Sequence, residues 1–558
     1  QDLWYDTTTY SDHNMVNSYR GSIVGLTPNT RYEVRLTLDS GTTSTVTEKT
    51  WNENFPVGSA IYVSSGSSTY TTTTSGSANG YVVYDGGGSV INVNKNSDNC
   101  IVINNDYVIL RNFDLRGARK AAITFSPGVH HVIIENCDIS AWGSLRTGTY
   151  GRSQGAIEMT TNNTHVVIQR NKIHNPSYDT NNWGGGSHPY GPCGMKLGST
   201  NTDSNGRIKD NGCWTTVVRY NEIYSGNINL HFEDGLQCAP PDSDIYGNII
   251  KDINDNGLEL ETGGNRNVRV WGNYLYHIYN AIASVPVHIG PLYVFRNVSD
   301  GYDNTGNSDG ARPYKVGGNN YSGSWYETES TKGYAYFYHN VNLSVSGTDD
   351  GFQQTDGGPK YLVSRNNILL ATHKSIHGCT DSTNSFDYDL YNAAIDVKEP
   401  HGISGSPIWK AGNGPDGGTA AGWYQLSSSS PGYGDACLLY NFNDMYTSPD
   451  RGAHQHGTAK MEFGVDAYIS STFFSNNFEV GNSNDRSISS GTRSVATDGT
   501  YIYKNTNNTG DAWSFAGSSW TNSVAMITKK IITYFDGDFE QINHALKIYS
   551  FAKVIAEL

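Results

Sequence analysis

The sequence is poor in charged residues and has no long apolar run. Charged side chains occupy 16% of the 558 positions, and no stretch of about 18 consecutive apolar residues occurs, so no segment is predicted to span a membrane. Acidic residues outnumber basic ones, 53 against 38, which gives a net charge of -15 at pH 7. Because nucleic acid binding usually needs clustered lysine and arginine, nucleic acid is not an expected partner.

Cysteine is scarce as well. The seven cysteines are scattered and include no C-x-x-C pair, so neither a disulfide scaffold nor a cysteine-based zinc site is expected. Cys193 and Cys213 flank a polar insertion, where the sequence allows either a disulfide or a pair of buried thiols. The first residue is Gln1, without a signal peptide, which indicates a mature or truncated chain.

What the sequence does contain favours strands and turns. Glycine (62 residues) and tyrosine (38) are abundant, and asparagine, serine and threonine are frequent. Tyrosine and threonine favour strands, while glycine and asparagine favour turns, so the composition predicts an all-β protein. Only residues 526–558 differ: glycine nearly vanishes there, and apolar residues at helical spacing predict a short C-terminal helix.

A repeat begins at about residue 56. Each unit has a β-branched run, an asparagine and a second short strand, as in "YVILRNFDL", "HVIIENCDI", "TTVVRYNEI" and "VRVWGNYL". Successive asparagines are 24, 35, 50, 27, 25, 24, 43 and 26 residues apart, which is a base period interrupted by insertions. Such a period predicts a solenoid of stacked coils. The recurring residues are Asn112, Asn136, Asn171, Asn221, Asn248, Asn273, Asn297, Asn340 and Asn366, and we expect them to form a structural hydrogen-bonded ladder.

The repeat resembles that of the right-handed parallel β-helix superfamily, which includes pectate lyases and polygalacturonases. The resemblance covers residues 56–400 and implies parallel coils closed around an apolar interior. More narrowly, "NGLELETGGNRNVRVWGNYL" followed by "GPLYVFRN" is similar to a group of secreted bacterial β-helix proteins with a fibronectin-like segment in front. No settled activity comes with that group, so the resemblance predicts the fold rather than the function.

Three further segments flank the repeat. Residues 1–55 contain "GLTPNTRYEVRL", which resembles part of a fibronectin type III domain and predicts a small, partial β-sandwich. Residues 401–525 lose the period and are predicted to be an irregular extension that packs on the last coils. Residues 526–558 resemble the start of an HD-domain protein, with His544 in a comparable context, but the sequence stops before a metal site and favours a capping helix or a fusion.

Alternation of side chains along each strand predicts a line of outward residues. Aligning "GAIEMT", "GMKLGS", "GLQCAP" and "GLELET" by their inward apolar positions places Glu158, Lys196, Gln237 and Glu259 on one line, between Thr124 and Ala283. Glu261 lies two residues beyond Glu259, about 7 Å along the strand, a separation suited to an inverting acid/base pair. The plain alternative is a charge-balanced surface ladder.

Large insertions are expected to build walls beside this line. Exposed aromatic rings on loops stack on sugar faces, and a groove with carboxylates on its floor suits a glycan. Asp234 at the corner before the line is a further catalytic candidate, although the paired-Asp motif of polygalacturonases is not present here. The predicted substrate-binding residues are Trp142, Trp183, Tyr190, His188 and Arg266.

These residues predict a secreted enzyme that hydrolyses a polysaccharide with carboxylates as general acid and base. No cofactor is required, and calcium is an optional ion. One alternative is a polysaccharide lyase with Lys196 as base and Glu158, Glu259 and Glu261 as calcium ligands. Chondroitinase B-like lyases have a Glu-x-Glu pair followed by a catalytic lysine, but Gly263 and Gly264 occupy that place here. The other alternative is a non-catalytic β-helix that binds glycans or has a structural role at the cell surface.

A second polar segment, "TDDGFQQTDGG", contains Asp349, Asp350, Gln353 and Asp356. Its residue types suit the far end of a groove or a calcium site, but a polar turn is the simpler interpretation. No confident metal site follows from the sequence.

Overall fold

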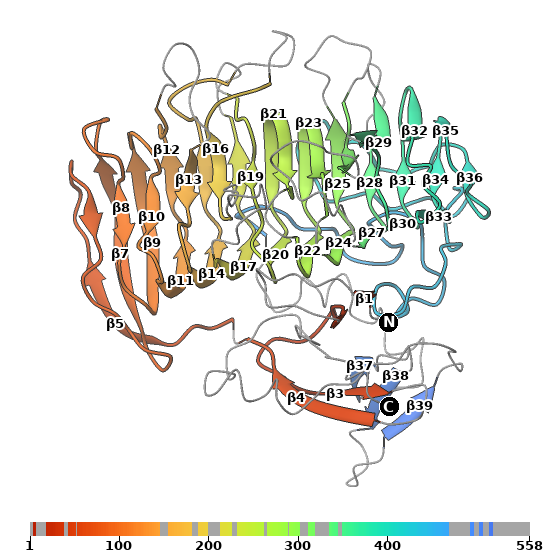
Figure 1. Cartoon of the computed structure of the whole chain (residues 1–558), viewed down its shortest axis with the longest axis horizontal. Helices are drawn as coiled ribbons and strands as arrows, with labels where there is room; N and C mark the ends of the chain where they lie inside the picture. The colour runs from red at the N-terminus through yellow and green to blue at the C-terminus, as the bar shows by residue number, and fades with distance from the viewer. Residues whose placement is uncertain are drawn as a thin grey trace.

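The computed structural model shows a right-handed parallel β-helix with smaller antiparallel sheets beside it (Figure 1). No helix, and hence no membrane-crossing helix, occurs in the part of the chain that the structure describes. That part comprises residues 4–6, 18–37, 43–51, 53–144, 154–180, 188–198, 212–225, 231–261, 265–287, 290–301, 311–318, 334–343, 349–355 and 357–467, and the backbone of 491–495, 501–505 and 513–516. The predicted helix at 526–558 lies outside it.

Each coil of the β-helix contributes a strand to each of three parallel sheets. The first, here called the site sheet, contains β6 (Tyr70–Thr71), β8 (Ile101–Ile103), β10 (Ile123–Phe125), β13 (Gly155–Glu158), β16 (Cys193–Lys196), β19 (Leu236–Gln237), β26 (Tyr314–Gly317), β29 (Asp350–Thr355), β32 (Lys374–His377) and β35 (Ala394–Ile395).

The second sheet contains β5 (Val57–Tyr62), β11 (His130–Glu135), β14 (Thr164–Gln169), β17 (Trp214–Arg219), β20 (Asp244–Tyr246), β22 (Val268–Trp271), β24 (Leu292–Phe295), β27 (Ala335–Tyr338), β30 (Leu362–Arg365) and β33 (Ser385–Asp387). The third contains β12 (Asp138–Ser140), β15 (Lys172–His174), β18 (Glu222–Tyr224), β25 (Val298–Gly301), β28 (Val341–Asn342), β31 (Ile368–Leu369), β34 (Leu390–Tyr391) and β36 (Ile403–Ser404). Four long strands bend from one sheet into the next: β7 (Tyr81–Asn92), β9 (Val108–Arg116), β21 (Ile249–Glu259) and β23 (Tyr274–Ser284).

The interior is apolar, as the alternation of side chains predicts. The first inward position of the aligned strands is fully buried in every coil and pairs in register with the next. These residues are Ile123, Ile157, Met195, Leu236, Leu258 and Ile282. Alternation also predicts Cys238, two residues after Leu236, as an inward residue of the core. This is wrong, because a φ of 59° at Cys238 turns the chain and Ala239 joins the core instead.

An asparagine ladder runs along one corner of the coils. Asn221 donates from its backbone N–H and its Nδ2 to Oδ1 of Asn248, at 2.9 and 3.0 Å, and also from Nδ2 to the carbonyl of Ile168. The same contacts recur from coil to coil along the rungs Asn171, Asn221, Asn248, Asn273, Asn297, Asn340, Asn367 and Asp389.

Three of the nine predicted rungs are misplaced by one residue. Asn112, Asn136 and Asn366 have φ of 60°, 53° and 60° and occupy the left-handed position just before the rung. Asparagine tolerates this conformation better than most residues, so both positions of the turn select it. Cys137 is the rung that follows Asn136, and its N–H donates to Asn171.

The N-terminal segment docks on the second sheet. β1 (Trp4–Asp6) pairs with β2 (Ser18–Arg20), and β3 (Arg31–Thr37) pairs with β4 (Thr43–Lys49), both antiparallel. Val24 and Trp51 join the apolar cluster on the outside of that sheet. Near the C-terminus, β37 (Gly491–Val495), β38 (Tyr501–Asn505) and β39 (Trp513–Ala516) form an antiparallel sheet, and β37 contacts β3. The fibronectin-like assignment stays a prediction.

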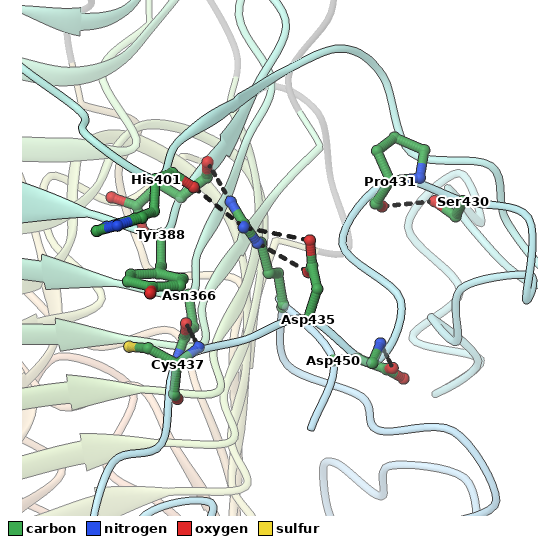
Figure 2. A network of polar contacts seen from close by, with 12 residues as sticks. Asn366, Tyr388, His401, Ser430, Pro431, Asp435, Cys437 and Asp450 are labelled. Carbon is green, nitrogen blue, oxygen red and sulfur yellow. Dashed lines mark hydrogen bonds and ion pairs between the residues drawn. The ribbon is translucent and has the colours of Figure 1, made fainter. Parts of the chain in front are cut away.

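Residues 401–467 cover the outside of the last coils. Arg451 is buried, donates to the carbonyls of Asp389 and His401, and forms an ion pair with Asp435 at 3.0 Å. Asn366 exchanges hydrogen bonds with the backbone of Cys437, as Figure 2 shows. The extension therefore packs against the coils.

All seven cysteines are free thiols, and six of them are buried. Cys193 and Cys213 do not form a disulfide, so the thiol alternative is the correct one.

Candidate active site

The site sheet carries one outward column of polar side chains. Parallel pairing aligns Thr124, Glu158, Lys196, Gln237, Glu259 and Ala283 in the predicted order. The column continues through Lys315, Gln353 and His377. Sequence reasoning missed Lys315 and His377, and it named Gln353 only in a segment for which a polar turn was the simpler interpretation. Lys315 follows a long insertion, but it alternates with buried Tyr314 and Val316, which was the available signal.

Glu259 lies at the centre of the column in an acidic environment. Its side chain is partly exposed, but its Oε2 atom is buried and has no hydrogen-bond partner among the described residues. Burial, together with the charges of Glu261, Asp255 and Glu233, raises the pKa of Glu259 to about 8. A carboxyl with this pKa exchanges protons near neutral pH, as a catalytic acid or base must.

Glu261 is not a free partner for Glu259. It is buried and forms an ion pair with Nζ of Lys315, at 2.9 Å. Burial raises the pKa of Glu261, while the charge of Lys315 opposes the rise. The predicted acid/base pair of Glu259 and Glu261 is therefore wrong in one respect, because the second carboxylate is already engaged by a cation from a later coil.

Two aspartates lie at the corner that precedes the column. Asp234 is buried and accepts hydrogen bonds from the backbone N–H and Nδ2 of Asn256, at 3.1 and 3.0 Å, and from Nε2 of Gln237, at 3.4 Å. Burial and the neighbouring carboxylates hold the pKa of Asp234 well above its ordinary value. Asp234 thus belongs to the same cluster as Gln237 and Glu259, and its catalytic role stays a prediction.

Asp255, the other corner aspartate, pairs with His188. Asp255 is buried, and its Oδ2 lies 3.1 Å from Nε2 of His188, whose side chain is 48% exposed. Burial raises the pKa of Asp255, but the hydrogen bond from His188 and the charge of Lys315 lower it below its ordinary value. Burial lowers the pKa of His188, yet the same hydrogen bond and the charge of Asp255 raise it to about 9. At neutral pH the pair is therefore an imidazolium and a carboxylate.

Unlike Lys315, which is paired with Glu261, Lys196 of the column is available to bind an anion. Its ammonium forms no ion pair with any other described residue, whereas neighbouring Glu158 accepts a hydrogen bond from the N–H of Gly155 at 2.9 Å. Burial lowers the pKa of Lys196, but Cys193, Cys238 and the carboxylates of Glu158 and Glu259 raise it overall. Lys196 is therefore protonated, which argues against the predicted role as a base and favours contact with an anion.

The predicted substrate-binding residues divide into three groups. Tyr190 is 40% exposed and packs beside the ring of His188, with centroids 5.4 Å apart, so both line the open side of the site. Trp142 is fully buried, donates to the carbonyls of Gln154 and Cys193, and packs on a core phenylalanine, so the prediction of an exposed ring is wrong. Arg266 is also buried, which contradicts direct exposure to substrate. Trp183 lies outside the described residues.

Among the residues that the structure describes, two groups of side chains have the donor atoms and spacing to hold a metal ion. One is Cys193, Glu233 and Asp234 in the acidic cluster, and the other is Asp350, His373 and His377 farther along the same sheet. The second group contains Asp350 of the segment that the sequence favoured as a polar turn.

Comparison with known proteins gives limited similarity. No protein-family description matches the chain, and no curated protein sequence matches it. Solved structures that resemble it include pectate lyase Pel9A (14% identity, TM-score 0.32, 72% of this chain and 86% of that one), the PL6 family alginate lyase AlyGC (9%, 0.39, 64% and 52%) and an alginate lyase from Paenibacillus sp. str. FPU-7 (13%, 0.34, 63% and 94%). Likenesses at these levels carry no conclusion about the activity of this chain.

Proposed function

We propose that the column is the active site of a secreted enzyme that cleaves a uronate-containing polysaccharide by β-elimination. The observation that carries the proposal is the pairing of functions on the two coils that flank Gln237: Lys196 forms no ion pair with any described residue, and Glu259 is a carboxyl with a pKa of about 8. Elimination next to a carboxylate needs a cation that binds the carboxylate and a nearby group that accepts and returns a proton.

The chemistry assigns one step to each residue. The ammonium of Lys196 pairs with the uronate carboxylate and stabilises the negative charge that develops on it. The ionised Glu259 takes the proton from the carbon next to that carboxylate. The electrons of the broken C–H bond form the new C=C bond, the glycosidic C–O bond breaks, and the leaving oxygen takes the proton back from Glu259. No water is consumed, and the product carries an unsaturated uronate.

Hydrolysis remains a second candidate because Glu259 can also serve as a general acid in its protonated form. An inverting hydrolase needs in addition an ionised carboxylate that is free to activate water. Near Glu259, Glu261 is paired with Lys315 and Asp255 with His188, so neither carboxylate is free for this task. This pairing favours elimination over hydrolysis.

The oxygen atoms of the cluster also suit calcium. Calcium prefers carboxylate and amide oxygens, and Oε1 of the buried Gln237 has no hydrogen-bond partner among the described residues. Asp234 and Gln237 would hold the ion beside Glu259, and its charge would help neutralise the substrate carboxylate. Glu261 is not a fitting ligand, because Lys315 occupies its carboxylate.

Replacing Lys196 tests the anion-binding role. We expect Lys196→Met to lower kcat/KM on pectate or alginate by about 100-fold, since one charge-assisted contact made in the transition state is lost. Lys196→Arg keeps the charge and should retain most of the substrate affinity. Lys120→Met is the matched control, because Lys120 is an exposed lysine that pairs with Asp98. Equal activity of Lys196→Met and Lys120→Met would contradict the proposal.

The pH dependence separates the two candidate reactions. If Glu259 is the base of an elimination, kcat/KM rises as pH increases through about 8, because only the ionised form accepts a proton. If Glu259 is the acid of a hydrolase, activity falls through the same range. Initial rates between pH 6 and 10 are measured on uronic and neutral polysaccharides by ultraviolet absorbance and by reducing ends together. No cleavage of any polysaccharide would favour the alternative that the protein binds glycans without cleaving them.

A further inference from the structure

A second polar cluster lies on the site sheet, four coils beyond Gln237. Gln237 pairs in register with Glu259, and the column then passes through Ala283 and Lys315 to Gln353. With coils spaced at about 4.8 Å, Gln237 and Gln353 are about 19 Å apart. In this outer region, Asp350 of β29 faces two histidines of the next coil.

The cluster joins a buried carboxylate to two accessible imidazoles. Asp350 is fully buried, its Oδ1 lies 2.9 Å from Nδ1 of His373, and its Oδ2 lies 2.8 Å from Nδ1 of His377. The two histidine side chains are 45% and 34% exposed, and their rings are nearly perpendicular with centroids 5.3 Å apart. One carboxylate and two imidazole nitrogens therefore lie within 4.8 Å of one another near the surface.

The local sequence repeats that of the acidic cluster. "DDGFQ" at 349–353 and "EDGLQ" at 233–237 both place Asp, Gly, an apolar residue and Gln in the same order at the start of a site-sheet strand. Both glycines are required by close approach: a Cβ at Gly235 would lie 2.5 Å from the carbonyl oxygen of Gly257, and one at Gly351 would lie 2.3 Å from that of Ser375. The two corners thus use the same tight contact with the following coil.

An unpartnered acceptor lies beside the cluster. Gln353 is 7% exposed, pairs in register with His377, and has an Oε1 atom that is buried without a hydrogen-bond partner among the described residues. A buried amide oxygen left without a donor costs free energy unless another group completes it. The atom thus marks a place where a ligand or its bound water is expected.

We propose that Asp350, His373 and His377 bind a divalent transition-metal ion such as zinc. Zinc takes imidazole nitrogen and carboxylate oxygen at about 2.0–2.2 Å, and two ligands at that distance in a tetrahedral site are about 3.4 Å apart. The separations observed here, 2.9 and 2.8 Å, would have to open by only about 0.5 Å to admit the ion. Calcium prefers oxygen donors alone, so the nitrogen ligands select against it. Three protein ligands leave a coordination position open on the exposed side.

The backbone holds the three ligands in place. The amide of Lys374 donates to Oδ1 of Asp350 at 3.0 Å, and the side chain of Lys374 pairs with Asp396. The amides of Thr372 and His373 both donate to the carbonyl of Asp349. These contacts fix the corner before any metal arrives, which lowers the ordering cost of binding.

The experiment uses the whole chain after treatment with a chelator. Zinc is titrated calorimetrically and cobalt is followed by its visible absorption, which reports nitrogen ligands. We expect one equivalent bound with micromolar or tighter affinity, weakened at least tenfold in His373→Gln and in His377→Gln. Both histidines are partly exposed, so the variants should fold. His174→Gln is the matched control, because His174 also pairs with an aspartate, Asp138 at 2.9 Å, but lies outside the cluster.

Two results would overturn the proposal. One is the absence of zinc binding tighter than about 0.1 mM, and the other is binding that neither histidine variant weakens. The test is independent of the proposed cleavage, because Glu259→Gln should bind zinc like the unchanged chain even if it cleaves nothing.

Discussion

Glu259→Gln is expected to lower kcat/KM for polysaccharide cleavage by about 1000-fold, because the amide can neither accept nor return the proton. The substitution keeps the shape of the side chain, so binding of the polysaccharide should change little. Cleavage is measured by the ultraviolet absorbance of the unsaturated uronate and by new reducing ends, and binding is measured separately on the uncleaved polymer. Gln237→Glu is not a suitable control, because Gln237 belongs to the same cluster.

The same variant should be more stable than the unchanged chain at alkaline pH. A carboxyl whose pKa is raised to about 8 in the folded state and is about 4.3 in the unfolded state stabilises the fold at low pH relative to high pH. The free energy of unfolding therefore falls as pH rises from about 4.5 to 8, because Glu259 ionises less readily in the folded chain than in the unfolded one. In chelator-treated protein, the Tm of Glu259→Gln should exceed that of the unchanged chain by an amount that grows over this range and then levels off.

This combination separates a catalytic role from a structural one. Loss of activity together with a gain in stability would mean that the chain keeps Glu259 for its chemistry, at a cost in the free energy of unfolding. If Glu259→Gln lost both activity and stability at every pH, Glu259 would be a structural residue of the column, and the surface-ladder interpretation would be preferred.

Asn273→Ala is expected to lower the free energy of unfolding by about 4 kcal/mol, because it leaves several buried polar groups without partners. The backbone N–H and Nδ2 of Asn248 lose the Oδ1 of Asn273, and the carbonyl of Ile245 loses its Nδ2 donor. Urea unfolding followed by circular dichroism measures the change, with the slope checked for equality between variants.

Asn104→Ala is the matched control for the ladder. Asn104 is an exposed residue of the same solenoid, and its replacement should change stability by less than about 0.5 kcal/mol. Equal effects of the two substitutions would mean that the ladder adds no specific stability to the coils.

The parallel coils and the column could be predicted because both follow from strand alternation. Once Ile157, Met195, Leu236 and Leu258 are placed inside, the neighbour of each must point outward and align with the next coil. That reasoning uses only local sequence and a repeated period, and it holds where coils are regular. It missed Lys315 because the long insertion before it interrupts the period.

Other features depend on contacts that no local pattern encodes. Trp142 resembles an exposed loop aromatic in sequence, but its indole fills the core and finds two backbone carbonyls. Glu261 resembles a second catalytic carboxylate until Lys315, 54 residues later, is seen to pair with it. The misplaced rungs have a different origin: adjacent positions in one turn both favour asparagine, and sequence alone does not tell which is the rung.

The asparagine ladder has a direction along the axis of the solenoid. Each asparagine rung donates its backbone N–H and one Nδ2 hydrogen to Oδ1 of the rung in the following coil, while its second Nδ2 hydrogen goes to a backbone carbonyl of the preceding coil. The side-chain amides therefore all have the same orientation along the row. The row ends at Asp389, which accepts from both the N–H and Nδ2 of Asn367 and from Ser364. A carboxyl group is well placed at that end, because it needs only to accept. Within the row an aspartate would break the polarity, so the fold can change Asn to Asp only at its last rung.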